Sequence, residues 1–140
     1  MTSTAESPLI LVVDDVEDAR EICSEYLAFR GYRVITAEDG MEALAKATEL
    51  LPDLILMDLA LPVLDGWEAT RRLKKDERTR HIPVVALTAH AVKGISDQAI
   101  EAGCLAVLTK PIAPSLLAAE VERILEEQTS EPTPAMAVAV

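Results

Sequence analysis

The stretch Leu9-Ile10-Leu11-Val12-Val13-Asp14-Asp15 decides the fold of this chain. Its five consecutive apolar residues fall far short of the roughly 20 that a membrane span requires. They suit a strand of a parallel sheet, because helices bury such a strand on both faces and leave it no polar side. The two carboxylates that follow stand at the carboxyl end of that strand, where ligands bind in open α/β sheets.

Four similar runs follow along the chain and alternate with longer stretches of helical periodicity. The five apolar runs cover residues 9–13, 34–36, 54–57, 84–87 and 105–108. The second run is the shortest and follows Arg33, which suits an edge strand. The alternation predicts an α/β fold of five βα units with a doubly wound parallel sheet.

Helices are expected after each run. Three of them are expected at 65–75, 91–102 and 114–128, and two earlier ones between the first three runs. Gly31 and Gly103 are expected to end the first and fourth helices, because a left-handed residue is favoured there. The second helix is expected to bury one apolar face, formed by Met41, Leu44, Ala45, Thr48 and Leu51.

Composition bounds the possible functions. A length of 140 residues suits one domain, and a hydrophobic fraction of 50% is too high for a disordered chain. The 13 basic and 24 acidic residues give a net charge of −11, which opposes direct binding to nucleic acid because such binding depends on Lys and Arg. The basic cluster at 71–80 is interpreted as a solvated helix end. The sequence shows neither a signal peptide nor a membrane span. We therefore expect a cytoplasmic location and no membrane partner.

The periodic pattern covers residues 8–128, which are expected to form the domain. Residues 1–7 and 129–140 are rich in Ser, Thr, Pro, Glu and Ala and are expected to be disordered tails. A short docking peptide is the alternative for the apolar end of the second tail. Cys23 and Cys104 lack metal-ligand or redox spacing, so both are expected to be buried free thiols.

Polar side chains follow four of the five runs. Asp14 and Asp15 follow the first run, Asp58 the third, Thr88 the fourth and Lys110 the fifth. Because the carboxyl ends of parallel strands meet at one edge of a sheet, these side chains are expected to share one site. Neighbouring carboxylates destabilise a fold unless a cation neutralises them, and Mg²⁺ prefers oxygen ligands. A carboxylate between such a cation and an ammonium group can attack a phosphoryl group.

Four motifs surround these polar residues. They are Val12-Val13-Asp14-Asp15, then Asp58 with Leu61-Pro62 and Asp65-Gly66, then Leu87-Thr88-Ala89, and finally Lys110-Pro111-Ile112. With these four motifs the chain resembles a response-regulator receiver domain of two-component signalling, and the resemblance covers roughly residues 8–128. The resemblance implies a CheY-like, flavodoxin-like fold with strand order 2-1-3-4-5.

The resemblance also implies a role for each residue of the site. Asp14, Asp15 and Asp58 are implied to hold Mg²⁺ together with the backbone carbonyl of Ala60. Asp58 is implied to accept the phosphoryl group, Thr88 to be the switch hydroxyl and Lys110 to bond a phosphoryl oxygen. A cis peptide bond is implied before the proline that follows Lys110.

The function implied by the resemblance is that of a single-domain response regulator. Its phosphoryl donor is a histidine kinase or a histidine phosphotransfer protein, and it signals by changed binding to a downstream protein that the sequence does not identify. Mg²⁺-dependent self-phosphorylation and slow self-dephosphorylation are the only catalytic steps expected, so the chain is not expected to be an enzyme.

Some positions depart from the family pattern or vary within it. Val107 stands where the family usually has Tyr or Phe, and a small, stiff valine cannot swing as a ring does. The signal is therefore expected to travel mainly through the 88–94 loop, which contains Gly94. Ala60 and His90 occupy variable positions that bear on phosphate lifetime, and for His90 a plain solvated loop residue is the alternative.

Three other interpretations remain open from sequence. A receiver domain excised from a hybrid histidine kinase has the same motifs. A haloacid-dehalogenase-type phosphatase also uses an aspartyl nucleophile with Mg²⁺, but it requires a second acid where Ala60 stands. A flavodoxin-like cofactor binder needs a loop that cradles phosphate after the first strand, and the acidic stretch at 14–18 repels phosphate.

Overall fold

A computed structural model describes residues 7–89 and 94–130 of the chain. All five predicted runs form strands, which pair in parallel in the order β2-β1-β3-β4-β5. The strands are β1 (Leu9–Val13), β2 (Arg33–Ala37), β3 (Leu54–Asp58), β4 (Val84–Thr88) and β5 (Ala106–Thr109). The predicted fold class, strand order and edge position of the second run are confirmed.

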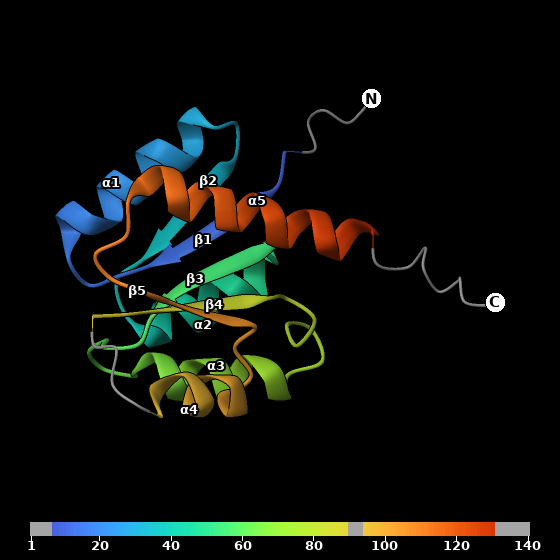
Figure 1. Cartoon of the computed structure of the whole chain (residues 1–140). Helices are drawn as coiled ribbons and strands as arrows, with labels where there is room; N and C mark the ends of the chain where they lie inside the picture. The colour runs from blue at the N-terminus through green and yellow to red at the C-terminus, as the bar shows by residue number, and fades with distance from the viewer. Residues whose placement is uncertain (1–6, 90–93, 131–140) are drawn as a thin grey trace.

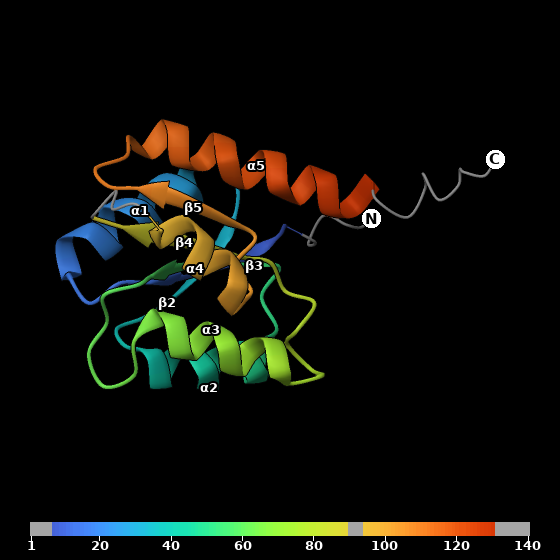
Figure 2. The same ribbon diagram turned by 60° about the horizontal axis from the view of Figure 1, so that its bottom comes forward.

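Five helices cover the two faces of the sheet. They are α1 (Glu17–Phe29), α2 (Gly40–Leu50), α3 (Gly66–Lys75), α4 (Ile95–Ala102) and α5 (Pro114–Ser130). Helices α1 and α5 lie on one face, whereas α2, α3 and α4 lie on the other (Figure 1 and Figure 2). This three-layer arrangement explains why the central strands have no polar side.

Side chains of each strand alternate between two hydrophobic cores. On β1, Leu11 and Val13 point into the core beneath α2, α3 and α4, whereas Ile10 and Val12 point into the core beneath α1 and α5. Strands β3 and β4 are buried along their whole length. Burial on both faces fixes the register, since a slip of one residue exchanges the two faces. The carboxyl ends of the strands are thereby held in line.

Two glycines let helices approach the loop that follows β3. A Cβ atom on Gly40, the first residue of α2, would overlap the carbonyl oxygen of Leu64. A Cβ atom on Gly66, the first residue of α3, would overlap the carbonyl oxygen of Asp58 and lie 2.8 Å from the Cα atom of Leu59. Neither site has room for a side chain, so these glycines set how closely both helices pack against the end of β3.

The predicted buried face of the second helix is only partly correct. Leu44 packs against the core as predicted, whereas Met41 is 48% exposed and Ala45 is exposed. Leu51 lies just beyond the helix, in the left-handed conformation with φ 48°. Ala43 and Ala47 are fully buried in the same core, because their small side chains allow α2 to lie close to the strands.

Helix bounds shift slightly from those expected. Helix α3 begins one residue late because Asp65 caps it and accepts a hydrogen bond from the N–H of Glu68. Helix α5 continues two residues into the predicted second tail. The predicted start of the fourth helix at 91 and most of both tails lie outside the described residues. Gly31 and Gly103, with φ 101° and 114°, follow α1 and α4 as predicted. Within the described ranges, no helix combines the length and apolar character that crossing a membrane demands.

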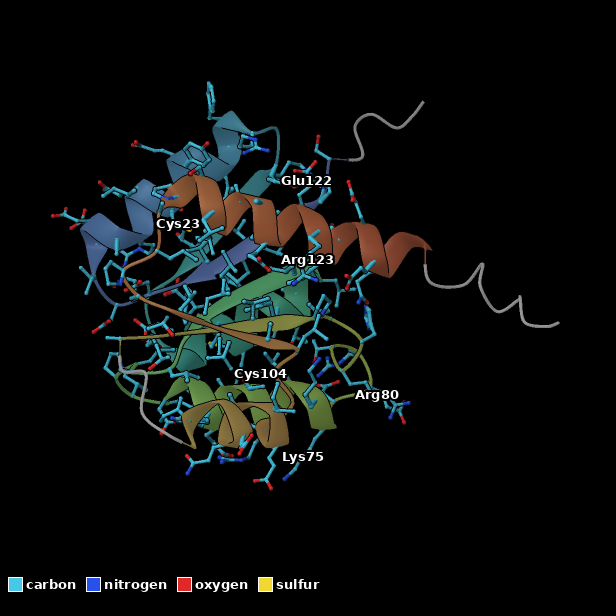
Figure 3. All side chains as sticks on the ribbon, viewed as in Figure 1. Cys23, Lys75, Arg80, Cys104, Glu122 and Arg123 are labelled. Atoms are coloured by element: carbon cyan, nitrogen blue, oxygen red, sulfur yellow. The ribbon has the colours of Figure 1, made fainter. Side chains whose placement is uncertain are left out.

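Both cysteines are free thiols, and they lie on opposite faces of the sheet (Figure 3). Cys104 is buried as predicted, whereas Cys23 keeps part of its surface exposed. Burial raises the pKa of Cys23 to about 12 and also raises the pKa of Cys104. Neither thiol is therefore primed for redox or metal chemistry.

The basic cluster lies at the end of α3 and in the turn after it, where Figure 3 labels Lys75 and Arg80. Three of its four arginines form local ion pairs: Arg71 and Arg72 with Glu68, and Arg78 with Asp76. These ion pairs and the exposure of the cluster agree with a solvated helix end.

Candidate functional site

The carboxyl ends of four strands bring the predicted polar residues together. Asp58 and Thr88 are the last residues of β3 and β4, and Asp14 and Lys110 directly follow β1 and β5. In the ladder between β3 and β4, Asp58 lies opposite Leu87. The backbone N–H of Lys110 donates to the carbonyl oxygen of Thr88 at 2.7 Å, which aligns the ends of β4 and β5.

Three carboxylates meet at this edge of the sheet. One oxygen from each of Asp14, Asp15 and Asp58 lies within 4.8 Å of the other two. Asp14 and Asp58 are only 4% and 6% exposed, whereas Asp15 is exposed. Two buried negative charges destabilise a fold unless a cation and hydrogen bonds compensate them.

Lys110 supplies that compensation. Its Nζ atom donates to Oδ2 of Asp14 and to Oδ2 of Asp58, both at 3.0 Å. Burial by itself lowers the pKa of Lys110, but the hydrogen bonds and charges of the two aspartates outweigh it, so the pKa lies above the ordinary 10.5. Lys110 is therefore charged at neutral pH and joins the ends of β1, β3 and β5.

Asp58 receives a hydrogen bond at each carboxylate oxygen. Its Oδ1 atom accepts from the N–H of Ala60 at 2.9 Å, and its Oδ2 atom accepts from Lys110. Burial raises the pKa of Asp58 above the ordinary 3.8, and the charge of Asp14 adds to this, although the bonds from Ala60 and Lys110 oppose it. The carboxylate is thus oriented by two donors and only partly solvated, which suits a nucleophile.

A pocket of about 720 Å³ opens above these residues. Its lining includes Asp15, Asp58, Trp67, Thr88 and Lys110. Thr88 is only 8% exposed and contributes the pocket's hydroxyl group. A phosphoryl group that entered here would meet a carboxylate, an ammonium group and a hydroxyl, which are the three chemical groups that the sequence predicted.

The donor set fits Mg²⁺. That ion takes oxygen ligands at about 2.1 Å, so opposite ligands of one ion span roughly 4.2 Å. The three carboxylate oxygens lie within 4.8 Å of one another, so small side-chain movements would let all three bind a single ion. The exposed Asp15 leaves one side of the cluster open to water and phosphate oxygens, as Mg²⁺ requires. The backbone N–H of Ala60 donates a hydrogen bond to Asp58, and the metal-binding role of the Ala60 carbonyl stays a prediction.

The structure describes only some of the positions that depart from the family pattern or vary within it. Val107 is partly buried on β5 and packs against the core beneath α2, α3 and α4. His90 and most of the predicted signal-carrying loop at 88–94 lie outside the described residues. The peptide bond between Lys110 and Pro111 is cis, as predicted.

Sequence reasoning missed two residues near the site. Arg20 of α1 contacts the backbone of Asp14, and no motif in the sequence signals that contact. Trp67 of α3 packs against the core and also lines the pocket. Its position in the first turn of a helix that begins eight residues after Asp58 is the signal that the sequence offers.

Comparison with known sequences places the chain among signalling proteins. The sequence profile of the response regulator receiver domain matches residues 10–122. The polar-differentiation response regulator DivK of Brucella ovis is 43% identical over 104 residues, which are 74% of this chain and 85% of that protein. The response regulator PleD of Caulobacter vibrioides is 45% identical over 118 residues, which are 84% of this chain and 26% of that protein.

Solved structures agree with the sequence comparison. A CheY-like receiver domain protein from Methanospirillum hungatei matches with a TM-score of 0.84 and 29% identity, over 90% of this chain and 99% of that one. The receiver domain of a sensor histidine kinase from Pseudomonas aeruginosa matches with a TM-score of 0.75 and 38% identity, over 86% of this chain and 96% of that one. That second structure has a magnesium ion coordinated in its active site cleft.

Proposed function

The chain belongs to the response regulator receiver domain family of two-component signalling, and on this premise we propose that Asp58 is its phosphoacceptor. Receiver domains are signalling proteins and not classical enzymes, and they interact with histidine kinases or phosphotransfer proteins. One observation carries the assignment. Lys110 forms ion pairs with two buried carboxylates, those of Asp14 and Asp58. Asp58 lines the same pocket as Thr88, whereas Asp14 lines the neighbouring apolar pocket beside α1.

The roles of the residues follow from their contacts. A carboxylate oxygen of Asp58 attacks the phosphorus atom of a phosphohistidine, the P–N bond breaks, and the imidazole nitrogen keeps the electron pair. Lys110 already lies 3.0 Å from Asp58 and is placed to donate to a phosphoryl oxygen. The hydroxyl group of Thr88 donates to another. Asp14, Asp15, Asp58 and the carbonyl of Ala60 would hold Mg²⁺, which would supply positive charge to stabilise the negative charge of the phosphoryl group.

The proposed partners follow from this chemistry. The donor is a histidine kinase or a histidine phosphotransfer protein, and the output is changed binding to a downstream protein. Self-phosphorylation from a small donor and slow self-dephosphorylation are the only catalytic steps. The cytoplasmic location and the domain bounds 8–128 stay predictions.

Of the three alternatives, one retains support. A receiver domain of a hybrid histidine kinase stays open, because the receiver domain of the Pseudomonas aeruginosa sensor kinase is 38% identical to this chain. Membership of the receiver family contradicts the phosphatase and the cofactor-binder interpretations.

Intact mass spectrometry tests the phosphoacceptor. The wild-type chain incubated with acetyl phosphate and Mg²⁺ is expected to gain one phosphoryl group, and Asp58→Asn is expected to gain none. Asp53→Asn is the matched control, because Asp53 lies just before β3 at the amino end of the strands and its side chain accepts from the N–H of Leu9 at 2.8 Å. Phosphorylation of Asp58→Asn at the wild-type yield would overturn the assignment.

A further inference from the structure

Arg20 is the fourth residue of α1, at the end of its first turn, and its side chain turns back toward the end of β1. Its Nη1 atom donates to the backbone carbonyl oxygen of Asp14 at 2.7 Å. Its Nη2 atom lies 3.7 Å from a carboxylate oxygen of Glu38, which follows β2. The Arg20 side chain is only 13% exposed, whereas that of Glu38 is 70% exposed. The guanidinium group therefore spans two loops at the site edge of the sheet.

The contact with Asp14 matters because the loop between β1 and α1 carries two of the three carboxylates. The Asp14 side chain is held by its own two hydrogen bonds: Oδ1 accepts from the N–H of Val16 at 2.9 Å, and Oδ2 accepts from Lys110. Asp15 differs. In the part of the chain that the structure describes, no hydrogen bond or ion pair holds its carboxylate. The direction of the Asp15 side chain therefore depends on its backbone.

The Arg20 bond fixes that backbone. A peptide unit is planar, so the carbonyl oxygen of Asp14 and the N–H of Asp15 move as one body. Helix α1 begins after Val16, which makes no side-chain capping bond. The N–H of Val16 donates to Oδ1 of Asp14 and so holds the loop on the far side of Asp15, whereas the Asp14–Asp15 peptide is held through its carbonyl oxygen by Arg20. By holding the Asp14 carbonyl, Arg20 sets the plane from which the Asp15 side chain projects toward Asp14 and Asp58.

We propose that Arg20 is a positioning residue for the divalent-cation site, which acts by orienting the Asp14–Asp15 peptide. The inference rests on the proposed function in that it assumes a cation held by Asp14, Asp15 and Asp58. Arg20 itself would not contact the cation.

The sign of the effect separates this role from a simple charge effect. A guanidinium group near the site repels Mg²⁺, so if charge alone mattered, removing Arg20 would strengthen binding. Loss of a group that orients a metal ligand weakens binding instead, typically 10- to 100-fold. Arg20→Met is therefore expected to raise the Mg²⁺ dissociation constant about tenfold. Arg20→Lys is expected to recover part of the loss, because its ammonium group can still donate to the Asp14 carbonyl.

Fluorescence of Trp67 provides the measurement. Trp67 is the only tryptophan in the chain and lines the pocket with Asp15 and Asp58, so its emission reports a cation at the site. Mg²⁺ is titrated into the full chain for the wild type, Arg20→Met, Arg20→Lys and Arg30→Met. Arg30 is the matched control: it ends the same helix, pairs with Glu122 of α5 at 3.3 Å and does not contact the loop (Figure 3 labels Glu122). Arg30→Met is expected to keep the wild-type dissociation constant.

Further readouts separate positioning from unfolding. Melting temperatures in EDTA show whether each variant is folded, and the phosphorylation rate of Arg20→Met is expected to approach the wild-type rate at saturating Mg²⁺. If Arg20→Met does not fold, Arg20→Lys stands in, because it keeps the positive charge and loses only the guanidinium geometry, and it is expected to raise the dissociation constant by a smaller factor. An unchanged or lower constant in the folded Arg20 variant overturns the inference alone. Failure of the wild type to bind Mg²⁺ overturns the proposed cation site and the inference together.

Discussion

Replacing Gly66 with alanine tests how the fold positions Asp58. The added Cβ atom would overlap the carbonyl oxygen of Asp58 and lie 2.8 Å from the Cα atom of Leu59. Carbon atoms in ordinary contact are roughly 3.5–4.0 Å apart. Helix α3 and the end of β3 must therefore separate by about 1 Å to accommodate the methyl group. The helix cannot withdraw freely, because Ala69, Thr70 and Leu73 are buried beneath it.

The expected losses follow from this displacement. Overpacking of a tight site costs about 1–3 kcal/mol of the free energy of unfolding. For a domain of this size, 1 kcal/mol lowers the melting temperature by roughly 3–5 °C, so Gly66→Ala is expected to melt about 5–10 °C below the wild type. A misplacement of about 1 Å costs on the order of 10²-fold in rate when it moves a reacting group. The phosphorylation rate is therefore expected to fall at least about tenfold.

Thermal denaturation and intact mass spectrometry with acetyl phosphate measure the two effects. Gly31→Ala is the control, because its φ of 101° strains an alanine but the added Cβ atom meets nothing within 4 Å. That strain costs about 1–2 kcal/mol, so Gly31→Ala is expected to melt earlier and keep the wild-type rate. A Gly66→Ala variant with the melting temperature and rate of the wild type would refute the close-approach argument.

Three further predictions concern the site and the thiols. At ten times its dissociation constant, Mg²⁺ is expected to raise the free energy of unfolding by about 1.4 kcal/mol. Asp15→Asn is expected to lose most of that gain in thermal denaturation, and an equal gain in the variant would exclude Asp15 from the cation site. Lys110→Met leaves Asp14 and Asp58 buried without their cation, so urea denaturation is expected to show a loss of about 3 kcal/mol, and a loss below about 1 kcal/mol would contradict the pairing role. The pKa of Cys23, about 12, leaves a thiolate fraction on the order of 10⁻⁴ at pH 8. Iodoacetamide is therefore expected to label folded Cys23 slowly at pH 8, faster as the pH rises, and fastest in urea; rapid labelling of the folded chain at pH 8 would contradict the burial.

The strands and the site edge were predictable from sequence for a physical reason. A strand buried on both faces must be apolar throughout, so each run stood out from the amphipathic helices around it. Parallel strands also end at one edge, so Asp14, Asp58, Thr88 and Lys110 followed from their places after the runs. The chemical groups of the site therefore stand in the sequence directly at the ends of four strands, β1, β3, β4 and β5, with one or two residues at each.

The features that the sequence did not reveal depend on distances between separate elements. The inward face of α2 includes the predicted Leu44, but Ala43 and Ala47 are its fully buried residues, because their small side chains allow close packing that the hydrophobic pattern did not reveal. The need for glycine at Gly66 appears only when the backbone of Asp58 lies beside it. The contact between Arg20 and Asp14 joins a side chain to a backbone carbonyl, which leaves no trace in residue types.

Chemical trapping of the phosphorylated residue tests the central assignment most directly. The chain is phosphorylated with acetyl phosphate and Mg²⁺, reduced with borohydride, which converts an aspartyl phosphate to homoserine, and digested for peptide sequencing by mass spectrometry. Homoserine is predicted at position 58 alone, with none formed when EDTA replaces Mg²⁺. Homoserine at position 14 or 15, or at no position in a chain that had gained a phosphoryl group, would contradict the assignment of Asp58.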